Sequence, residues 1–570
     1  MAMELLKKLR WQLLIILIAL IVIASILWGQ QAEPVVVESP EPIGGGVYKE
    51  GIVGSFGRLN PLLARYNPAD QDVTSLIFTG LVQHDSKGYP QPDLANSWGI
   101  SKTGEIYNFS LRSDATWHDG QPVTSEDVVF TVSLLKDEEF PTPPDVESFW
   151  KDIEVEALDE HTLQFLLPEP FAPFLNYLDF GILPAHLLGD LSPSEIVDAD
   201  FNLNPIGTGP YQFDRFLGEN DQISGVALKR YGDYYQDQAY LEEFVFLYFD
   251  SHKAAWEAYE NGDVLGIGEI TEEILAPALD SPDLNLYTSR LPEMSIVLLN
   301  LDNPEVPFFQ DVELRQAMLQ GLNRQWMIDH IFNGQAVIAD GPIFPKTWAY
   351  YDGIKHYEYE PEKAVDALRD LGYSIPAEGG EVRVNEEEVR LAFTLLHPDD
   401  PEHRTLAETM QENWLRLGFE VNLKALSYEE LKTDYLAPRI YEAALIDLDL
   451  SHNPDPDPYP FWHQTQTTGG QNYSMWNDRQ ASEYIEQARI VFNNPEERAR
   501  LYRNFQVRFV DQMPALPLFY PMYTYGVSQD VKGVRIGPIF NPSDRLKTVT
   551  DWYFYSEIPG GQVLSETPAE

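Results

Sequence analysis

Cysteine is absent from the 570-residue sequence. Its absence excludes disulfides, thiolate zinc sites, iron–sulfur clusters, cysteine nucleophiles and lipid attachment through a cysteine. Basic residues are scarce as well, because 39 Lys and Arg stand against 90 Asp and Glu, a formal net charge of −51. A surface of that sign repels nucleic-acid phosphates and anionic lipid headgroups. We therefore expect no nucleic-acid partner and no basic membrane-binding patch.

Motifs of enzyme and metal sites are also missing. Gly54-Ser55-Phe56-Gly57 lacks the G-x-S-x-G spacing of a nucleophile elbow. Gly207-Thr208-Gly209 runs into a proline, whereas a phosphate-binding loop would open a helix. His452 and His463 lack the H-x-x-x-H spacing of a helical metal site, and the aspartates near them lack the glycine and terminal glutamate of a calcium loop. We expect no catalytic residue, no metal and no cofactor, although 90 acids leave a glycosidase-like carboxylate pair open.

The N-terminus has the features of a membrane segment. Basic residues precede an apolar run from Leu13 to Trp28, and Trp11 and Trp28 stand at its edges as interfacial anchors. We interpret 1–29 as an uncleaved anchor, with a cleaved signal peptide as the alternative. Residues 30–46 are rich in proline, glutamate and glycine, which is typical of a solvated linker. The positive-inside rule then places the body outside the cytoplasm.

The whole sequence has 44% hydrophobic residues, as expected of a folded chain, and its length suggests about three to four units. Its second half alternates strands and helices. Periodicity predicts one long helix over 311–332. Further on it predicts a strand at 389–396, a helix at 406–417, a strand at 419–426, a short helix near 429 and a strand at 442–450. This alternation of strands and helices favours an α/β unit with partly parallel strands.

A specific resemblance appears at 92–130, which reads PDLANSWGISKTGEIYNFSLRSDATWHDGQPVTSEDVVF. The segment resembles the signature of the family-5 extracellular solute-binding proteins of oligopeptide- and dipeptide-type ABC importers, with Ser125 in place of the usual alanine. Further landmarks keep the family order over residues 47–550. They are Leu59-Asn60-Pro61-Leu62, Gly207-Thr208-Gly209-Pro210-Tyr211, Phe308 to Leu322 and Met513-Pro514-Ala515-Leu516-Pro517-Leu518.

The resemblance implies an α/β, bilobed periplasmic-binding-protein fold of class II with an additional domain, preceded here by one N-terminal transmembrane helix. Lobe I would comprise 47–86, 205–298 and 516–558. The additional domain II would be 87–204, lobe III would be 299–515, and 559–570 would be a flexible tail. Chain crossings near 298 and 515 would form a hinge, and a ligand would be buried in the cleft when the lobes close.

Candidate ligand-binding residues follow the strand predicted at 442–450, because open α/β sheets bind ligands beyond the carboxyl ends of their strands. Relatives that bind peptides carry an aspartate just upstream of an Asp-Pro, where it pairs with the ligand's α-ammonium group. Here His452 stands at that position in one alignment, so Asp447, Asp449 or Asp455 could replace it. The remaining candidates are Phe56, Trp462 and Tyr473, of which Tyr473 follows an asparagine as is common in the family. The alternative is a proline-rich surface loop with exposed acids.

We therefore predict a monomeric, extracytoplasmic, membrane-anchored component of an ABC importer that delivers a small organic ligand to permease subunits without catalysis. A peptide is the leading ligand by resemblance, and an oligosaccharide is second because aromatic residues are plentiful. Two hypotheses from other classes are a secreted glycan hydrolase and a tethered sensor domain.

Overall fold

The computed structural model describes residues 14, 18, 42–219, 222–451 and 454–555. These belong to two units, one made of the chain ends, 1–43 and 555–570, and one body, 44–554. The predicted anchor, 1–29, lies outside the described residues except for Leu14 and Ile18. Among the residues described, we find no helix that combines the length and the apolar character needed to cross a membrane.

The body is organised by a sheet of 12 described strands in the order β17-β16-β18-β14-β19-β12-β2-β11-β10-β9, with β13 and β15 also paired to β19. Its strands are β2 (Val47–Val53), β9 (Tyr211–Glu219), β10 (Gln222–Arg230), β11 (Glu243–Phe249), β12 (Gly266–Ile267), β13 (Leu284–Arg290), β14 (Glu293–Leu299), β15 (Ala336–Ile338), β16 (Ala392–Pro398), β17 (Glu420–Leu426), β18 (Ala443–Asp449) and β19 (Ala515–Ser528). The described helices are α2 (Pro68–Ile77), α3 (Ser125–Leu135), α4 (Pro144–Trp150), α5 (Ala185–Leu188), α6 (Pro193–Val197), α7 (His252–Glu260), α8 (Glu272–Asp280), α9 (Val312–Gln320), α10 (Arg324–His330), α11 (Pro361–Asp370), α12 (Pro401–Leu417), α13 (Tyr428–Glu430), α14 (Tyr459–Trp462), α15 (Arg479–Ile490) and α16 (Pro495–Gln512).

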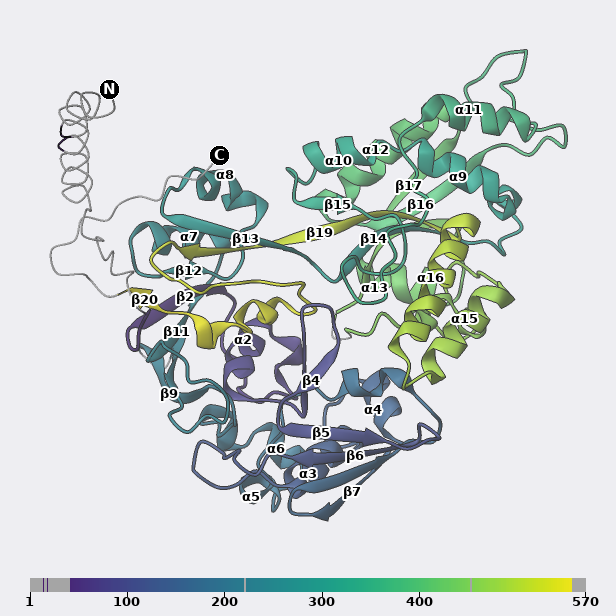
Figure 1. Cartoon of the computed structure of the whole chain (residues 1–570). Helices are drawn as coiled ribbons and strands as arrows, with labels where there is room; N and C mark the ends of the chain where they lie inside the picture. The colour runs from purple at the N-terminus through teal and green to yellow at the C-terminus, as the bar shows by residue number, and fades with distance from the viewer. Residues whose placement is uncertain (1–13, 15–17, 19–41, 220–221, 452–453, 556–570) are drawn as a thin grey trace, which may run out of the picture. The chain divides into compact units, whose positions relative to one another are not determined.

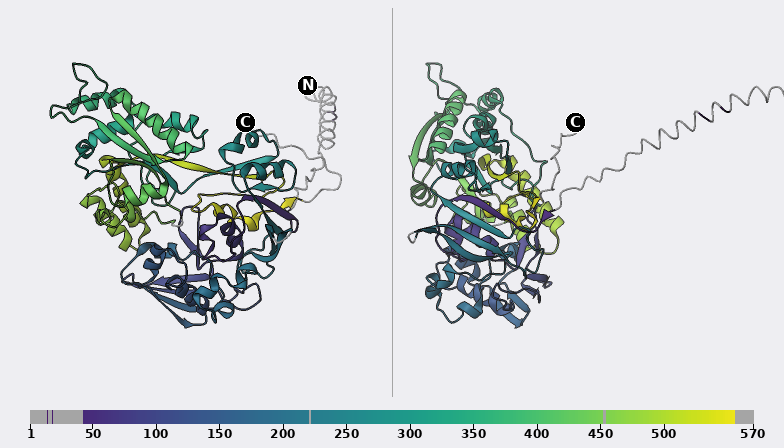
Figure 2. Two further views of the ribbon diagram at one scale, coloured as in Figure 1. Left: turned by 180° about the vertical axis from the view of Figure 1, so that it is seen from behind. Right: turned by 90° about the vertical axis from the view of Figure 1, so that its left-hand side faces the viewer.

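The body has three large hydrophobic cores, of which the first and third contain strands of this sheet. The first core extends from Tyr48 to Trp552 in sequence, the second from Leu81 to Ile182, and the third from Met294 to Tyr520. Figure 1 shows β19 running between the strands of the first and third cores, and Figure 2 shows the same from behind. The partners of β19 change accordingly, because its segment Ala515–Phe519 pairs with β14 and its segment Met522–Ser528 pairs with β13. One continuous strand therefore belongs to both cores.

The third core has the parallel arrangement that the sequence predicts. Strand β16 is parallel to both β17 and β18, and α12 connects β16 to β17. The single helix expected over 311–332 is instead two helices. Gly321 ends α9, and the side chain of Asn323 accepts a hydrogen bond from the Trp326 N–H, which begins α10.

The second core packs a separate antiparallel sheet, β5-β6-β8-β7, against α3 (Figure 1). Its strands are β5 (Ala95–Ile100), β6 (Ile106–Leu111), β7 (Glu154–Asp159) and β8 (Thr162–Leu166); β3 (Val82–His84) and β4 (Pro90–Pro92) form a hairpin nearby in sequence, and β1 (Pro42–Ile43) and β20 (Phe554–Tyr555) are short. Trp117 is fully buried, and the His118 N–H donates to the Gly207 carbonyl at 2.9 Å. A Cβ on Gly207 would lie 1.9 Å from the Ile77 carbonyl oxygen, so only glycine fits there. Two of the sequence landmarks thus pack against each other.

A buried ionic network lies inside the first core. The Arg545 guanidinium is 1% exposed and contacts Glu50 at 2.5 Å and Asp72 at 2.6 Å. The hydroxyls of Tyr48 and Tyr525 also donate to Glu50. Both carboxylates therefore depend on one cation for compensation, since the Glu50 side chain is fully buried and that of Asp72 is only 11% exposed.

We predict that Arg545→Leu lowers the free energy of unfolding by about 3–5 kcal/mol, because it leaves two buried carboxylates without a cation. The measurement is urea unfolding followed by tryptophan fluorescence. The matched control is Arg535→Leu, which removes an ion pair with Asp551 whose side chains are 71% and 47% exposed and should cost about 0–1 kcal/mol. Equal losses in the two variants would contradict the importance of the buried network.

Candidate functional site

The candidate site lies where β16 and β18 end. These strands are parallel, so residues that follow them meet at one edge of the sheet. Asp447 and Asp449 stand at the end of β18, and Asp400 and His403 open α12 directly after β16. The antiparallel neighbour β14 begins at the same edge, where Glu293 is the cross-strand partner of Asp449. The fold thus gathers side chains from three segments far apart in sequence.

His403 holds a central place in this group. Its Nδ1 lies 2.8 Å from an Asp400 oxygen and its Nε2 lies 2.9 Å from an Asp447 oxygen. A carboxylate therefore lies close to each ring nitrogen, and two such negative charges favour the protonated form of the imidazole. Burial alone would lower the pKa of His403, but hydrogen bonds and charge from Asp447 and Asp400 outweigh it and raise the pKa to about 9.

Asp447 is therefore already neutralised. Besides His403, it accepts a hydrogen bond from the Ser295 hydroxyl at 2.5 Å. Ser295 is 3% exposed and is the cross-strand partner of Asp447. Since both oxygens of Asp447 are occupied, this carboxylate serves to orient His403 and Ser295.

Glu293 and Asp449 differ from Asp447, because neither forms an ion pair among the described residues. Asp449 is exposed and accepts one hydrogen bond, from the Ser451 N–H. Burial, followed by the charges of Asp447 and Asp449, raises the pKa of Glu293 to about 7. Among the described residues, Glu293 and Asp449 are thus adjacent carboxyl groups that no ion pair neutralises.

Two tyrosines border the carboxyl groups. The Tyr428 ring is 47% exposed, and its hydroxyl donates to the Asp447 carbonyl at 2.9 Å. Burial of the hydroxyl, then the charges of Asp447, Glu293 and Asp449, raises the pKa of Tyr428 to about 12, and Tyr473 contributes as well. Tyr473 is partly buried beneath the Arg439 guanidinium, 4.6 Å from its ring. The structure thus brings together three of the residues nominated from sequence, Asp447, Asp449 and Tyr473.

The other nominated residues lie elsewhere. Asp455 is 3% exposed and makes a two-pronged contact with Arg498 at 2.7 and 3.0 Å, so it is the counter-ion of that arginine. Trp462 is 3% exposed and packs on Phe509 with ring centroids 4.7 Å apart. Phe56 packs on Phe216 beside the first core. His452 lies outside the described residues.

Sequence reasoning missed Glu293 and His403. The rule that located Asp447 beyond β18 applies equally to β16, and it would have selected the Asp400–His403 segment. No comparable signal marks Glu293, because only the antiparallel register of β14 and β18 brings it to this edge. Among the described residues, no group of three or more histidines or acids is arranged to hold a metal ion.

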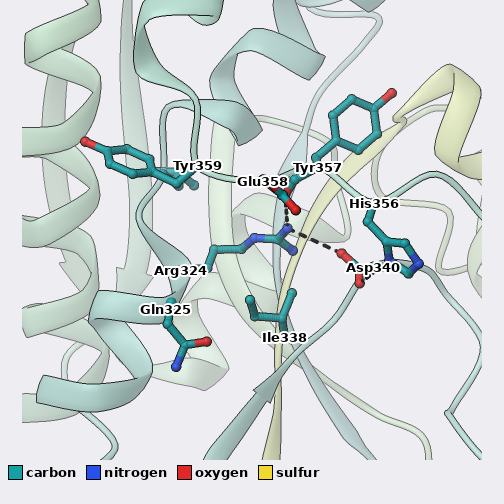
Figure 3. Close-up of a pocket in the computed structure, with 9 residues that line it drawn as sticks. Arg324, Gln325, Ile338, Asp340, His356, Tyr357, Glu358 and Tyr359 are labelled. Atoms are coloured by element: carbon teal, nitrogen blue, oxygen red, sulfur yellow. Dashed lines mark hydrogen bonds and ion pairs between the residues drawn. The ribbon is translucent and has the colours of Figure 1, made fainter.

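A separate cavity of about 280 Å³ lies in the third core region, and none of the nominated residues lines it (Figure 3). Arg324 donates to the carbonyls of Ala339 and Tyr357 at 2.7 and 2.6 Å, and Asp340 accepts from His356 at 2.8 Å. The polar groups of this cavity are thus largely engaged with one another. It offers less unpaired charge than the edge of the sheet.

Comparisons with known proteins identify the family. A family model described as bacterial extracellular solute-binding proteins, family 5 Middle, matches residues 89–472. The dipeptide-binding protein of Escherichia coli strain K12 is 25% identical over 466 residues, which cover 79% of this chain and 84% of that protein.

Solved structures show the same fold. HbpA2 from Haemophilus parasuis has a TM-score of 0.77 at 21% identity, covering 90% of this chain and 100% of its own. The oligopeptide-binding protein AppA of Bacillus subtilis, in complex with a nonapeptide, has a TM-score of 0.65 at 22% identity with the same coverage. The α/β, bilobed periplasmic-binding-protein fold expected from the sequence is therefore confirmed.

We predict that His403 titrates near pH 9, well above the ordinary value of about 6.5. Its charged form stabilises the folded state fully below about pH 6.5, and this contribution is lost as the pH rises through 9. Histidine NMR with ¹³C labelling, assigned through His403→Gln, measures the titration. Asp447→Asn should lower the midpoint clearly, whereas the control Asp449→Asn, which does not contact His403, should change it less. A wild-type midpoint near 6.5 would show that His403 is not held between two carboxylates.

Proposed function

This chain belongs to family 5 of the bacterial extracellular solute-binding proteins, and we propose that it captures peptides at the edge formed by β14, β16 and β18 and delivers them to an ABC importer. The observation that carries the proposal is the pair Glu293 and Asp449, two carboxyl groups without an ion pair among the described residues. The matched relatives named as dipeptide-binding and oligopeptide-binding proteins support a peptide ligand.

The peptide's α-ammonium group is the cation that this site would receive. It is protonated at neutral pH and can donate to more than one carboxylate at once. His403 directs it away from Asp447, because the imidazolium already occupies that carboxylate. Glu293 and Asp449 remain as its acceptors, and the rings of Tyr428 and Tyr473 provide apolar surface for the first side chain.

Closure of two lobes would bury the bound peptide. We retain the ranges 47–86, 205–298 and 516–558 for lobe I, 87–204 for domain II and 299–515 for lobe III. The change of partner along β19, from β14 up to Phe519 to β13 from Met522, supports a pivot between the first and third cores. Because the strand is continuous, bending there moves each core as a body.

The proposal also covers location and partners. The N-terminal basic residues and the apolar run to Trp28 support a membrane anchor that holds a monomeric body outside the cytoplasm near the permease. No covalent step is part of this function, since a binding protein releases its ligand unchanged.

Calorimetry with tri-alanine, N-acetyl-tri-alanine and maltotriose tests the proposal. Tri-alanine should bind, its acetylated form should bind about tenfold more weakly because it lacks the ammonium group, and maltotriose should not bind. Glu293→Gln and Asp449→Asn should each weaken tri-alanine binding about tenfold and leave the acetylated peptide unaffected, because only the free amine needs a counter-charge.

The matched control is Glu387→Gln, which removes the charge of an exposed acid elsewhere in lobe III. This variant should leave all affinities unchanged. Equal affinities for the two tripeptides, or binding of maltotriose alone, would contradict the proposed function.

A further inference from the structure

The Asp-Pro-Asp-Pro stretch, residues 455–458, forms two ion pairs through buried aspartates, and neither pair belongs to the candidate ligand site. Asp455 binds Arg498, and Asp457, which is 8% exposed, lies 3.0 Å from Arg489. Fixing two long arginine side chains costs conformational entropy, and burying the charges costs solvation. Besides its aspartate, each of the two arginines contacts an aromatic ring: Arg498 lies near Trp348 and Arg489 near Tyr459.

The first guanidinium supports a contact with the β3–β4 hairpin. Arg498 lies 4.8 Å from the Trp348 ring, and Trp348 stacks on Tyr89 of the hairpin with centroids 5.8 Å apart. The Trp348 N–H donates to the Lys87 carbonyl at 3.1 Å. The order Tyr89, Trp348, Arg498 is therefore a stack that joins the hairpin to the third core region.

The tip of the hairpin is built to present this contact. One oxygen of Asp85 accepts hydrogen bonds from the Lys87 and Tyr89 N–H groups at 2.8 and 3.0 Å. Gly88 has a φ of +85°, and a Cβ there would lie 2.8 Å from the Pro454 carbonyl oxygen. The turn is thus ordered by its own hydrogen bonds and lies directly against the start of the Asp-Pro-Asp-Pro stretch.

The second guanidinium contacts the additional domain. Arg489 lies 4.1 Å from the Tyr459 ring and 4.9 Å from the Phe171 ring. Tyr459 belongs to the third core region, whereas Phe171 packs against the second core. Arg489 is consequently a cation shared between aromatic rings of two different regions, and Asp457 keeps it in place.

We propose that these two stacks, Tyr89–Trp348–Arg498 and Tyr459–Arg489–Phe171, form a latch that holds lobe III closed against the β3–β4 hairpin and domain II. Opening the lobes removes Tyr89 from Trp348 and Phe171 from Arg489, while the ion pairs with Asp455 and Asp457 stay within lobe III. The latch sets the ratio of open to closed protein, whatever ligand the cleft holds.

Distance measurement by electron spin resonance tests the latch without added ligand. The chain has no cysteine, so Leu158→Cys in domain II and Glu362→Cys in lobe III introduce two unique labelling positions. Leu158 is 50% exposed and Glu362 is exposed. Labelled but otherwise unaltered protein should show one predominant short distance. Adding Tyr89→Ala and Phe171→Ala together should raise the population at longer distance about tenfold, because two ring contacts are lost.

Two controls separate a latch from general damage. Tyr89→Phe keeps the ring and should retain the short distance, and Tyr66→Ala removes a tyrosine that is 70% exposed and should change nothing. Thermal unfolding reports whether each variant is folded. An unchanged distance distribution in the folded double variant, or a long distance already predominant without these substitutions, would overturn the latch.

Discussion

Two like charges cannot lie side by side without a cation or a proton, and this constraint determines how the site works. Glu293 on β14 and Asp449 on β18 are cross-strand partners, and Asp447 stands two residues before Asp449 on β18. Among the described residues, the cation paired with these acids is His403, which lies between Asp400 and Asp447. Glu293 and Asp449 form no ion pair within that part of the chain, and burial with the neighbouring negative charges raises the pKa of Glu293 to about 7. In the proposed function, the cation that this pair receives is the ammonium group of the peptide.

The fold connects that local chemistry with motion of whole regions. The acids are attached to β14 and β18, and β14 pairs with β19, which continues into the first core. A ligand bound at this edge therefore lies next to the strand about which the lobes would turn. Arg498 and Arg489 pair with Asp455 and Asp457, not with Glu293 or Asp449. In the proposed latch, residues other than those that receive the ligand's charge would therefore control closure.

Much of the fold could be predicted from the sequence, whereas only part of the candidate site could. The motif at 92–130 and the alternation of strands and helices after 389 depend on local patterns, which a sequence displays directly. Asp447 and Asp449 followed from the rule for strand ends, and Tyr473 followed from the Asn-Tyr pair of the family resemblance. The positions of Glu293 and His403 beside Asp447 depend on how distant strands pair, which the sequence does not display. Asp455 was expected from the sequence to be exposed, but in the structure it is buried against Arg498. Those relations arise only when the chain has folded.

The most direct measurement of the central claim is the number of protons released when tri-alanine binds at pH 6.5, obtained by calorimetry in buffers of different ionisation enthalpy. An incoming ammonium group favours the ionised form of Glu293, whose pKa of about 7 in the empty site leaves it mostly protonated at this pH. The account predicts release of about three-quarters of a proton for the natural chain and almost none for Glu293→Gln. Binding without proton release, or with proton uptake, would contradict it.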